Sequence, residues 1–346
     1  MSSGLIYPPG CYADTKELVE LGRVVAQYGG FYASHIRDEE ERLTDAVKEA
    51  IEIGEKAGIP VEISHHKAAG KRSWGKVKQT LKIIDEARNR RVDVTCDVYP
   101  YLAGSTGLDA LLPPHSWEGG VEKLVERLKD PKTRRRLRRE MEEGLEGWSS
   151  LLRAGRWDAT MIAYCKGHRD YEGKTVSEIA KLKEADPFDF VFDLLIEEKA
   201  SVGVVLFLMC EKDLRTVLRH PVSMIGSDSS AHAPYGVLGK GKPHPRTYGT
   251  FPRVLGEYVR RTGVLTLENA VRKMTSLPAQ KLRLRDRGLI REGMWADITV
   301  FDPKKVADKA TYSEPHRYAV GVEFVLVNGK VVIDHGEHTG TLPGKV

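Results

Sequence analysis

Cysteine is scarce in this sequence, and neither sign of charge is in large excess. The chain has only four cysteines, so far apart that no CxxC pair exists. A zinc ribbon or a disulfide framework is therefore not expected, and a reducing cytoplasm is the expected location. Lys+Arg 54 against Asp+Glu 49 leaves a formal net charge of +5. That excess is too small to predict a nucleic-acid partner.

Long apolar runs and side-chain amides are also scarce. The strongest apolar run, at residues 204–209, is far too short to cross a bilayer, and no signal peptide is expected before residue 4. No membrane partner is therefore expected. Only three Asn and three Gln accompany a charged fraction of 30%, a balance that suggests heat adaptation through ion pairs. Hydrophobic residues make up 41% of the 346 residues, enough for one large domain or two smaller ones.

The front half of the chain alternates short β-rich segments with amphipathic helical ones. Strands are expected at residues 31–35, 61–65 and 92–101, and helices at about 39–57 and 75–90. Strands that alternate with helices predict a parallel sheet with crossover connections. The pattern therefore predicts an α/β open sheet or barrel.

Residues 115–158 interrupt this alternation with a charged, helical stretch that is interpreted as an insertion. Its basic run at 134–139 lies among glutamates with no interleaved aromatics, which favours a solvated, ion-paired helix face over a nucleic-acid site. Further strands are expected at 159–165 and 222–228, whereas 204–209 could be a strand or a buried helical turn.

The tail of the chain changes character. Two helices are expected near 250–261 and 266–283, and residues 297–301 and 322–327 then alternate like antiparallel strands. Asn328-Gly329 predicts a two-residue hairpin into a further strand. Residues 286–346 are therefore expected to form a small β-module.

Three expected strands end in side chains that bind metals: His35, His65 and Asp228. The C-terminal ends of parallel barrel strands gather at one face, so these residues are expected to converge. Two imidazoles and one carboxylate suit a borderline ion such as Zn²⁺. One histidine at a strand end is more often structural, but three such positions favour a metal site.

Several ordered motifs resemble those of the N-acyl-D-amino-acid deacylases, a family of the metal-dependent amidohydrolase superfamily. The similarity extends over nearly the whole chain. The motifs are Tyr32–Glu39 (YASHIRDE), Ile63–Lys67 (ISHHK), Asp97–Tyr101 (DVYPY), Ile225–Ser229 (IGSDS), and Pro243–Arg246 (PHPR) followed by Gly249–Leu255 (GTFPRVL).

The resemblance implies a fold, a cofactor and roles for particular residues. It implies an incomplete TIM-like (β/α) barrel over residues 1–285, with an insertion around 105–200, before the β-module at 286–346. His35 and His65 would bind the Zn²⁺ cofactor, and Asp228 would be the catalytic carboxylate that moves protons between water and the leaving amine. Lys67 and Tyr99 would bind the substrate's α-carboxylate, and Arg246 would be either a second anion contact or a structural anchor.

The chain departs from the family pattern at its beginning. Family members carry a His-x-His pair and a cysteine ligand on earlier strands, and this chain has no His-x-His and no cysteine at the expected place. A further segment that resembles the family, Gly4–Gly10 (GLIYPPG), already stands at residue 4. A start assigned too late or a frameshift, a separate partner chain that supplies the N-terminal barrel strands, or a truncated relative would each explain this.

The resemblance therefore implies a zinc-dependent hydrolase that cleaves small N-acyl-D-amino acids into a carboxylate and a D-amino acid. One alternative is a cyclic amidohydrolase of the dihydroorotase or hydantoinase type. Another is a non-catalytic remnant or subunit that needs an N-terminal partner, because two histidines and one aspartate alone supply about half of the family's metal ligands.

Overall fold

The computed structural model describes residues 1–345, and this part of the chain folds into two compact units. Each unit combines segments that are distant in the sequence. The first unit contains Met1–Asp97, Tyr101–Val217 and Lys240–His244, and the second contains Val98–Pro100, Leu218–Gly239 and the chain from Pro245 onward.

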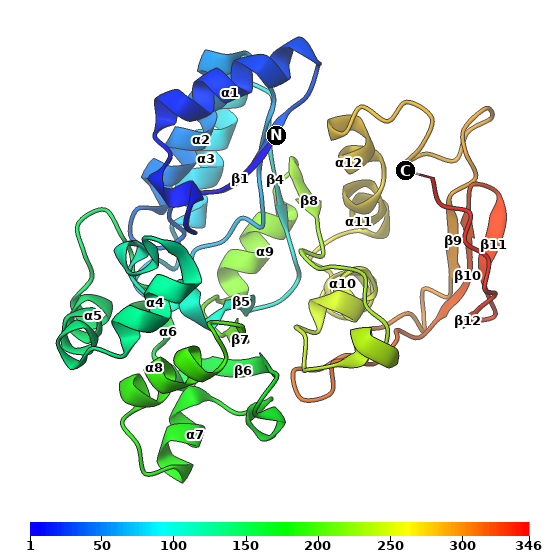
Figure 1. Cartoon of the computed structure of the whole chain (residues 1–346). Coiled ribbons are helices and arrows are strands. Elements are labelled where there is room, and N and C mark those ends of the chain that lie inside the picture. The colour runs from blue at the N-terminus through cyan, green and yellow to red at the C-terminus, as the bar shows by residue number, and fades with distance from the viewer. Residues whose placement is uncertain (346) are drawn as a thin grey trace. The chain divides into compact units, whose positions relative to one another are not determined.

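A parallel sheet forms the first part of the first unit, in the order β1-β2-β3-β4. Three helices connect its strands and lie side by side in Figure 1. The strands are β1 (Ser2–Gly4), β2 (Tyr32–His35), β3 (Val61–Ile63) and β4 (Val94–Val98), and the helices are α1 (Thr15–Gln27), α2 (Leu43–Ala57) and α3 (Val77–Asn89). The α/β alternation predicted from the sequence is confirmed.

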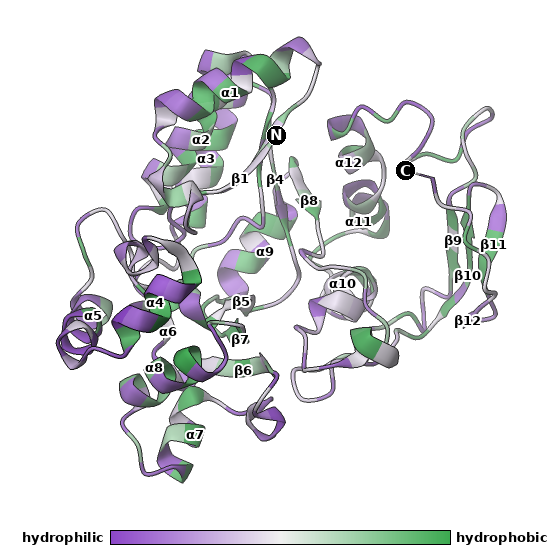
Figure 2. Cartoon of the chain, in the orientation of Figure 1, coloured by the Kyte–Doolittle hydropathy of each residue, from purple (hydrophilic) through white to green (hydrophobic). Residues whose placement is uncertain are grey.

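Helix α2 shows why these helices pack against the sheet. Its buried residues include Leu43, Val47 and Ile51, which recur at helical spacing and form one apolar face. Figure 2 shows hydrophobic residues mixed with hydrophilic ones along α1, α2 and α3. A Cβ at Gly54 would collide with the side chain of Val61, so glycine permits the close approach of α2 to β3.

The region expected as an insertion forms a second part of the first unit, an antiparallel sheet of order β5-β7-β6 packed against helices. Residues 204–206, left open between strand and helix, belong to a strand. The elements are β5 (Gly104–Gly107), β6 (Thr160–Cys165), β7 (Val202–Leu206), α4 (Gly120–Leu128), α5 (Pro131–Glu143), α6 (Leu151–Gly155), α7 (Val176–Leu182) and α8 (Pro187–Glu197).

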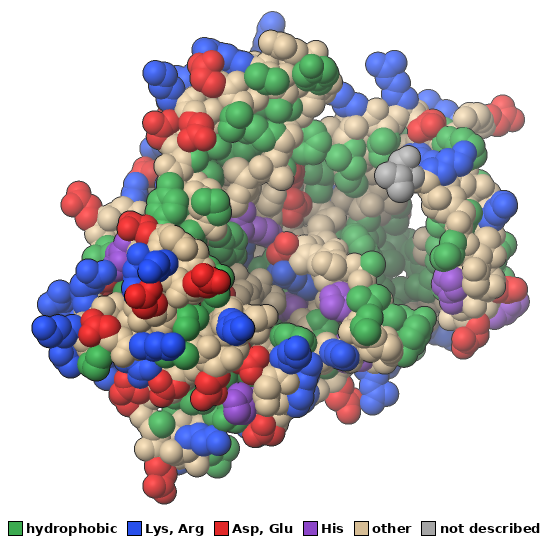
Figure 3. Space-filling view, viewed as in Figure 1, with side chains coloured by type: hydrophobic (Ala, Val, Ile, Leu, Met, Phe, Trp, Pro, Cys, Tyr) green, Lys and Arg blue, Asp and Glu red, His purple; other side chains and the backbone are tan. Residues whose placement is uncertain are grey.

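The basic run lies on α5. This helix begins at Pro131, which occupies the first helical position, and Asp130 is its N-cap. Arg134 lies 2.5 Å from Asp193, and Arg138 lies 3.1 Å from Asp186. Figure 3 shows basic and acidic side chains interleaved over the region of α4 to α8. The run therefore contributes to an ion-paired surface between helices.

The second unit contains the short strand β8, several helices and an antiparallel sheet of order β12-β11-β10-β9. Asn328 (φ 51°) and Gly329 (φ 77°) form the two-residue hairpin predicted between β10 and β11. The elements are β8 (Ser223–Ile225), α10 (Arg246–Arg253), the π-helix η7 (Val254–Arg261), α11 (Leu267–Met274), α12 (Ser276–Lys281), β9 (Ile298–Phe301), β10 (Val322–Val327), β11 (Lys330–Asp334) and β12 (Glu337–His338).

The predicted fold class, a barrel-type α/β part with a small antiparallel β-module, is confirmed. The boundary predicted between residues 285 and 286 stays a prediction, as does the extent of the insertion at 105–200. Within residues 1–345, no helix has both the length and the apolar character needed to cross a bilayer.

Candidate metal centre and catalytic carboxylate

His35 is the last residue of β2, and its imidazole is held in a partly covered site. The ring packs edge-on against Tyr7, with centroids 4.8 Å apart, and against His65, with centroids 4.3 Å apart. Its Nε2 atom is buried and finds no hydrogen-bond partner among residues 1–345. Burial lowers the pKa of His35 to about 3, so the imidazole is neutral and keeps a lone pair for a metal.

His65 lies two residues after β3 and has a left-handed backbone, with φ 40°. A non-glycine residue with positive φ is uncommon and is often found at functional sites. The backbone is fixed by the N–H of His65, which donates to Asp97 Oδ1 at 2.8 Å, and by the N–H of His66, which donates to the Asp97 carbonyl at 2.7 Å. Asp97 of β4 therefore fixes the backbone from which the His65 side chain projects.

Glu39 is the third member of the cluster, and no role for it was expected from the sequence. Ligand-type atoms of His35, Glu39 and His65 all lie within 4.8 Å of one another. Glu39 Oε1 lies 3.0 Å from His65 Nδ1 and 3.8 Å from His35 Nε2, and only 6% of the Glu39 side chain is exposed. The YASHIRDE motif contains both His35 and Glu39, but only the turn after β2 brings them together.

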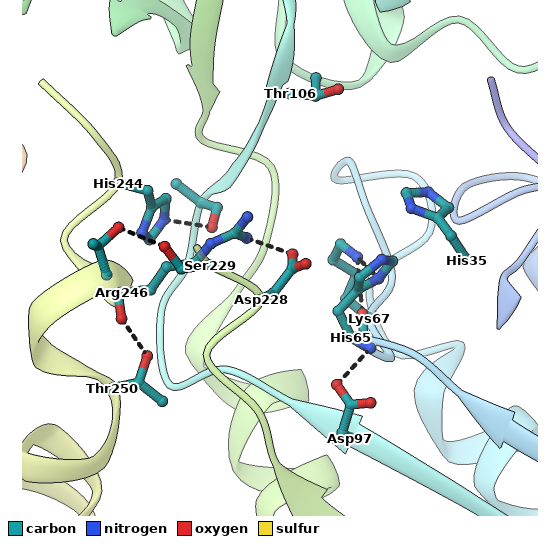
Figure 4. A network of polar contacts seen from close by, with 12 residues as sticks. His35, His65, Lys67, Asp97, Thr106, Asp228, Ser229, His244, Arg246 and Thr250 are labelled. Atoms are coloured by element: carbon teal, nitrogen blue, oxygen red, sulfur yellow. Dashed lines mark hydrogen bonds and ion pairs between the residues drawn. The ribbon is translucent and has the colours of Figure 1, made fainter. Parts of the chain in front are cut away.

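Lys67 places a positive charge in the same cluster (Figure 4). Its Nζ donates to Glu39 Oε1 at 2.5 Å and to the His65 carbonyl at 2.8 Å, and it lies 2.7 Å from His65 Nδ1. Burial alone would raise the pKa of the Glu39 carboxyl, but the positive charge of Lys67 and the hydrogen bond from His65 hold it well below its usual range. Glu39 is therefore an anion in a nearly dry site.

These residues fit a metal ion such as zinc. Two imidazoles and one carboxylate are nitrogen and oxygen donors of the kind that Zn²⁺ binds in proteins. The neutral His35 ring with an unpaired Nε2 and the ionised Glu39 are both in the protonation state that a ligand needs.

A second cluster contains the other three predicted site residues, Tyr99, Asp228 and Arg246, of which Figure 4 labels Asp228 and Arg246. Asp228 lies three residues after β8 and, like His65, has positive φ (49°). Its Oδ2 lies 2.8 Å from Arg246 Nη1, and Arg246 Cζ lies 4.6 Å from the centre of the Tyr99 ring. Asp228, Arg246 and Tyr99 all belong to the second unit.

The six predicted site residues thus fall into two groups. His35, His65 and Lys67 meet in the first unit, and Tyr99, Asp228 and Arg246 meet in the second. Their roles stay predictions. The other histidines near the motifs have local partners: His66 Nε2 lies 2.8 Å from Thr80 Oγ1, His244 Nε2 lies 2.8 Å from the Ala103 carbonyl, and His232 Nδ1 lies 3.1 Å from the Leu238 carbonyl.

Comparison with known proteins identifies the class. Residues 139–333, more than half of the chain, match the model of the amidohydrolase family. The chain therefore belongs to the amidohydrolase family. A D-aminoacylase of Alcaligenes xylosoxydans xylosoxydans is 36% identical to it over 346 residues, which cover 100% of this chain and 60% of that protein. The resemblance to the N-acyl-D-amino-acid deacylases is confirmed.

A solved structure gives the same relationship. The N-acyl-D-glutamate deacylase of Bordetella bronchiseptica, in a complex with zinc and a phosphonate mimic of the tetrahedral intermediate, is 34% identical with a TM-score of 0.76. The match covers 96% of this chain and 59% of that one, so the chain spans about 60% of the length of these relatives. In these relatives one chain contains both the matched part and the remainder, which gives no support to a separate partner chain.

Dihydroorotases are similar in sequence to a smaller part of the chain. A dihydroorotase of Endomicrobium trichonymphae is 38% identical over 72 residues, only 21% of this chain. The deacylases therefore resemble this protein in sequence over a much larger part of its length than this dihydroorotase does.

Proposed function

We propose that this protein is a zinc-dependent hydrolase that cleaves N-acyl-D-amino acids to a carboxylate and a D-amino acid. The observation that carries the proposal is the buried cluster of His35, Glu39 and His65, whose donor atoms suit zinc. The similarity to deacylases over the whole chain supports the substrate class. A small N-acyl amino acid is then the substrate, and the cytoplasm is the proposed location because Cys11, Cys96, Cys165 and Cys210 are all free thiols.

In this proposal His35 and His65 would hold the metal, and Glu39 is the carboxylate closest to both. Zinc in such a site supplies a Lewis acid that polarises a carbonyl and makes water nucleophilic near neutral pH. Asp228 takes the proton from water and delivers it to the leaving amine nitrogen as the amide C–N bond breaks. Lys67 and Tyr99 would contact the substrate's α-carboxylate. Lys67 also donates a hydrogen bond to Glu39.

The test combines elemental analysis with a panel of substrates, using the purified full chain. We expect bound zinc after dialysis, and hydrolysis of N-acetyl-D-amino acids but not of the L-enantiomers. Dihydroorotate and a hydantoin serve as the cyclic comparison. Turnover of the cyclic amides alone would reverse the proposal in favour of a cyclic amidohydrolase, and a chain with neither metal nor turnover would refute it.

The contribution of the metal and of the predicted ligands can be separated. A His35→Ala variant should lose zinc, whereas a His66→Ala variant should keep it, because His66 is turned to Thr80. Zinc retained by both variants would place the metal elsewhere in the chain.

A further inference from the structure

Arg246 is more firmly fixed in the structure than the carboxylate that it contacts. It is the first residue of α10, and only 8% of its side chain is exposed, against 39% for Asp228. Its guanidinium lies over the ring of Tyr99, which is itself buried, with 4.6 Å between Arg246 Cζ and the ring centre. A planar guanidinium held on an aromatic face loses little further freedom when it binds a carboxylate.

A second contact runs beside this ion pair. Ser229 Oγ and Thr247 Oγ1, the next residues along each segment, lie 2.7 Å apart. Two neighbouring residues of the segment after β8 are thus bound to the first two residues of α10. This double attachment holds Asp228, which has a positive φ of 49° that an ordinary loop residue rarely adopts.

We infer that Arg246 is a positioning residue for the Asp228 carboxylate, a role that differs from the predicted contact to the substrate's carboxylate. The inference rests on the proposed function, in which Asp228 is the proton-transfer group. The Asp228–Arg246 distance of 2.8 Å is that of a charge-assisted hydrogen bond, which constrains the direction of the carboxylate. An unconstrained carboxylate would sample directions that do not reach the reacting water.

The decisive comparison uses two substrates, an N-acetyl-D-amino acid and the matching N-acetyl amine without the α-carboxylate. Replacement by Arg246→Met should lower kcat by roughly 10- to 100-fold for both, because misplacing a reacting group has that cost. Arg246→Lys, which keeps the charge but not the planar fork, should recover part of kcat. A higher KM for the acid, with kcat for the amine substrate unchanged, would overturn the inference in favour of a substrate contact.

Thermal unfolding tests the pair without any turnover. Asp228→Asn, Arg246→Met and the double variant should show falls in Tm that are not additive, because one ion pair is lost in all three. Asp228→Asn combined with Arg260→Met is the matched control. Arg260 donates to the carbonyls of Pro303 (2.9 Å) and Val306 (2.8 Å) and does not contact Asp228. The fall in Tm caused by Arg260→Met should therefore add to the fall caused by Asp228→Asn.

The two assays separate this inference from the proposed function. A wild-type chain that hydrolyses neither substrate would refute the function, while the unfolding cycle would still decide whether Arg246 holds Asp228. Additive falls in Tm for Asp228→Asn and Arg246→Met would refute the positioning role even if the enzyme is active.

Discussion

The ammonium nitrogen of Lys67 lies 2.5 Å from Glu39 Oε1 and 2.7 Å from His65 Nδ1. Glu39 Oε1 also lies 3.0 Å from His65 Nδ1. One carboxylate therefore contacts both a candidate metal ligand and a cation that the sequence predicts to bind substrate. The same relationship recurs in the second cluster, where the cation of Arg246 faces Asp228. Each cation expected to bind substrate already has a carboxylate of this chain beside it.

Glu39→Gln should weaken both metal binding and stability. The substitution leaves the Lys67 ammonium, 13% exposed, without its anion, and breaking such a pair costs about 3–5 kcal/mol when it is buried. We expect a lower Tm and a metal affinity reduced by roughly 10- to 100-fold, measured by calorimetry and elemental analysis. Glu41→Gln is the control, because Glu41 is exposed and lies 3.5 Å or more from its arginine partners.

A double variant tests whether the Tm loss comes from the uncompensated ammonium. Adding Lys67→Met to Glu39→Gln should restore part of the lost Tm, since no buried charge is then left without a partner. A further fall in Tm would show that Lys67 stabilises the fold in another way.

Asp228→Asn should remove most of the turnover and leave the metal content unchanged. Loss of a general base typically lowers kcat by roughly 10²- to 10⁴-fold. Asparagine tolerates the left-handed conformation, so Asp228→Asn keeps the backbone at φ 49° and loses only the ion pair with Arg246, whereas Asp228→Ala should lower Tm further. Wild-type kcat in Asp228→Asn, at equal zinc content, would rule out this role for Asp228.

Metal removal should destabilise the chain. A ligand that binds only the folded state raises its stability, by about 2.7 kcal/mol at a concentration 100 times Kd. Zinc added to chelator-treated protein should therefore raise Tm in the wild type but not in His35→Ala. His66→Ala should begin from a lower Tm, because a buried contact to Thr80 is lost, and still show the rise. A zinc-dependent rise that persists in His35→Ala would exclude His35 as a ligand.

Glu40 should make the metal-free chain less stable as pH rises. Burial raises the pKa of its carboxyl well above the usual range, and Asp38, Glu39 and Glu41 add to the rise. The folded chain then holds this proton more tightly than the unfolded chain, whose pKa is roughly 4.3. Stability is therefore lost as pH increases from that value toward the folded pKa.

Glu40→Gln removes this dependence. In chelator, its Tm advantage over wild type should be small near about pH 4 and should grow toward about pH 8. Parallel Tm curves for the two proteins over that range would show that Glu40 does not carry an unfavourable buried charge.

The sequence predicts where the strands lie, because they follow local patterns, but it places two of their ends too late. The β-rich run at 31–35 ends at His35, and the structure ends β2 there. The strand expected to end at His65 stops at Ile63, and the one expected to end at Asp228 stops at Ile225, so both side chains lie on the segments that follow their strands. The Asn328-Gly329 pair is sufficient to predict the hairpin, since its geometry depends on two residues alone.

The contacts within each cluster could not be predicted in this way. Glu39 reaches His65 across a separation of 26 residues that includes α2 and β3, and Arg246 reaches Asp228 across 18, so both contacts depend on tertiary packing. The backbone at Asp228 also has a positive φ, which the sequence does not indicate because no glycine stands at this position. Such contacts depend on the packed fold, and no local spacing encodes them.

The two compact units have a practical consequence for anyone who wishes to divide this protein. The polypeptide passes from one unit to the other after residues 97, 100, 217, 239 and 244. A single cut therefore cannot release either unit whole: cleavage after 217 would leave 98–100 in one fragment and 240–244 in the other, each apart from the rest of its unit. The three residues that include Tyr99 would be separated from Asp228 and Arg246 by that cut. Point substitutions in the full chain, and not excised fragments, are the appropriate way to assign its chemistry.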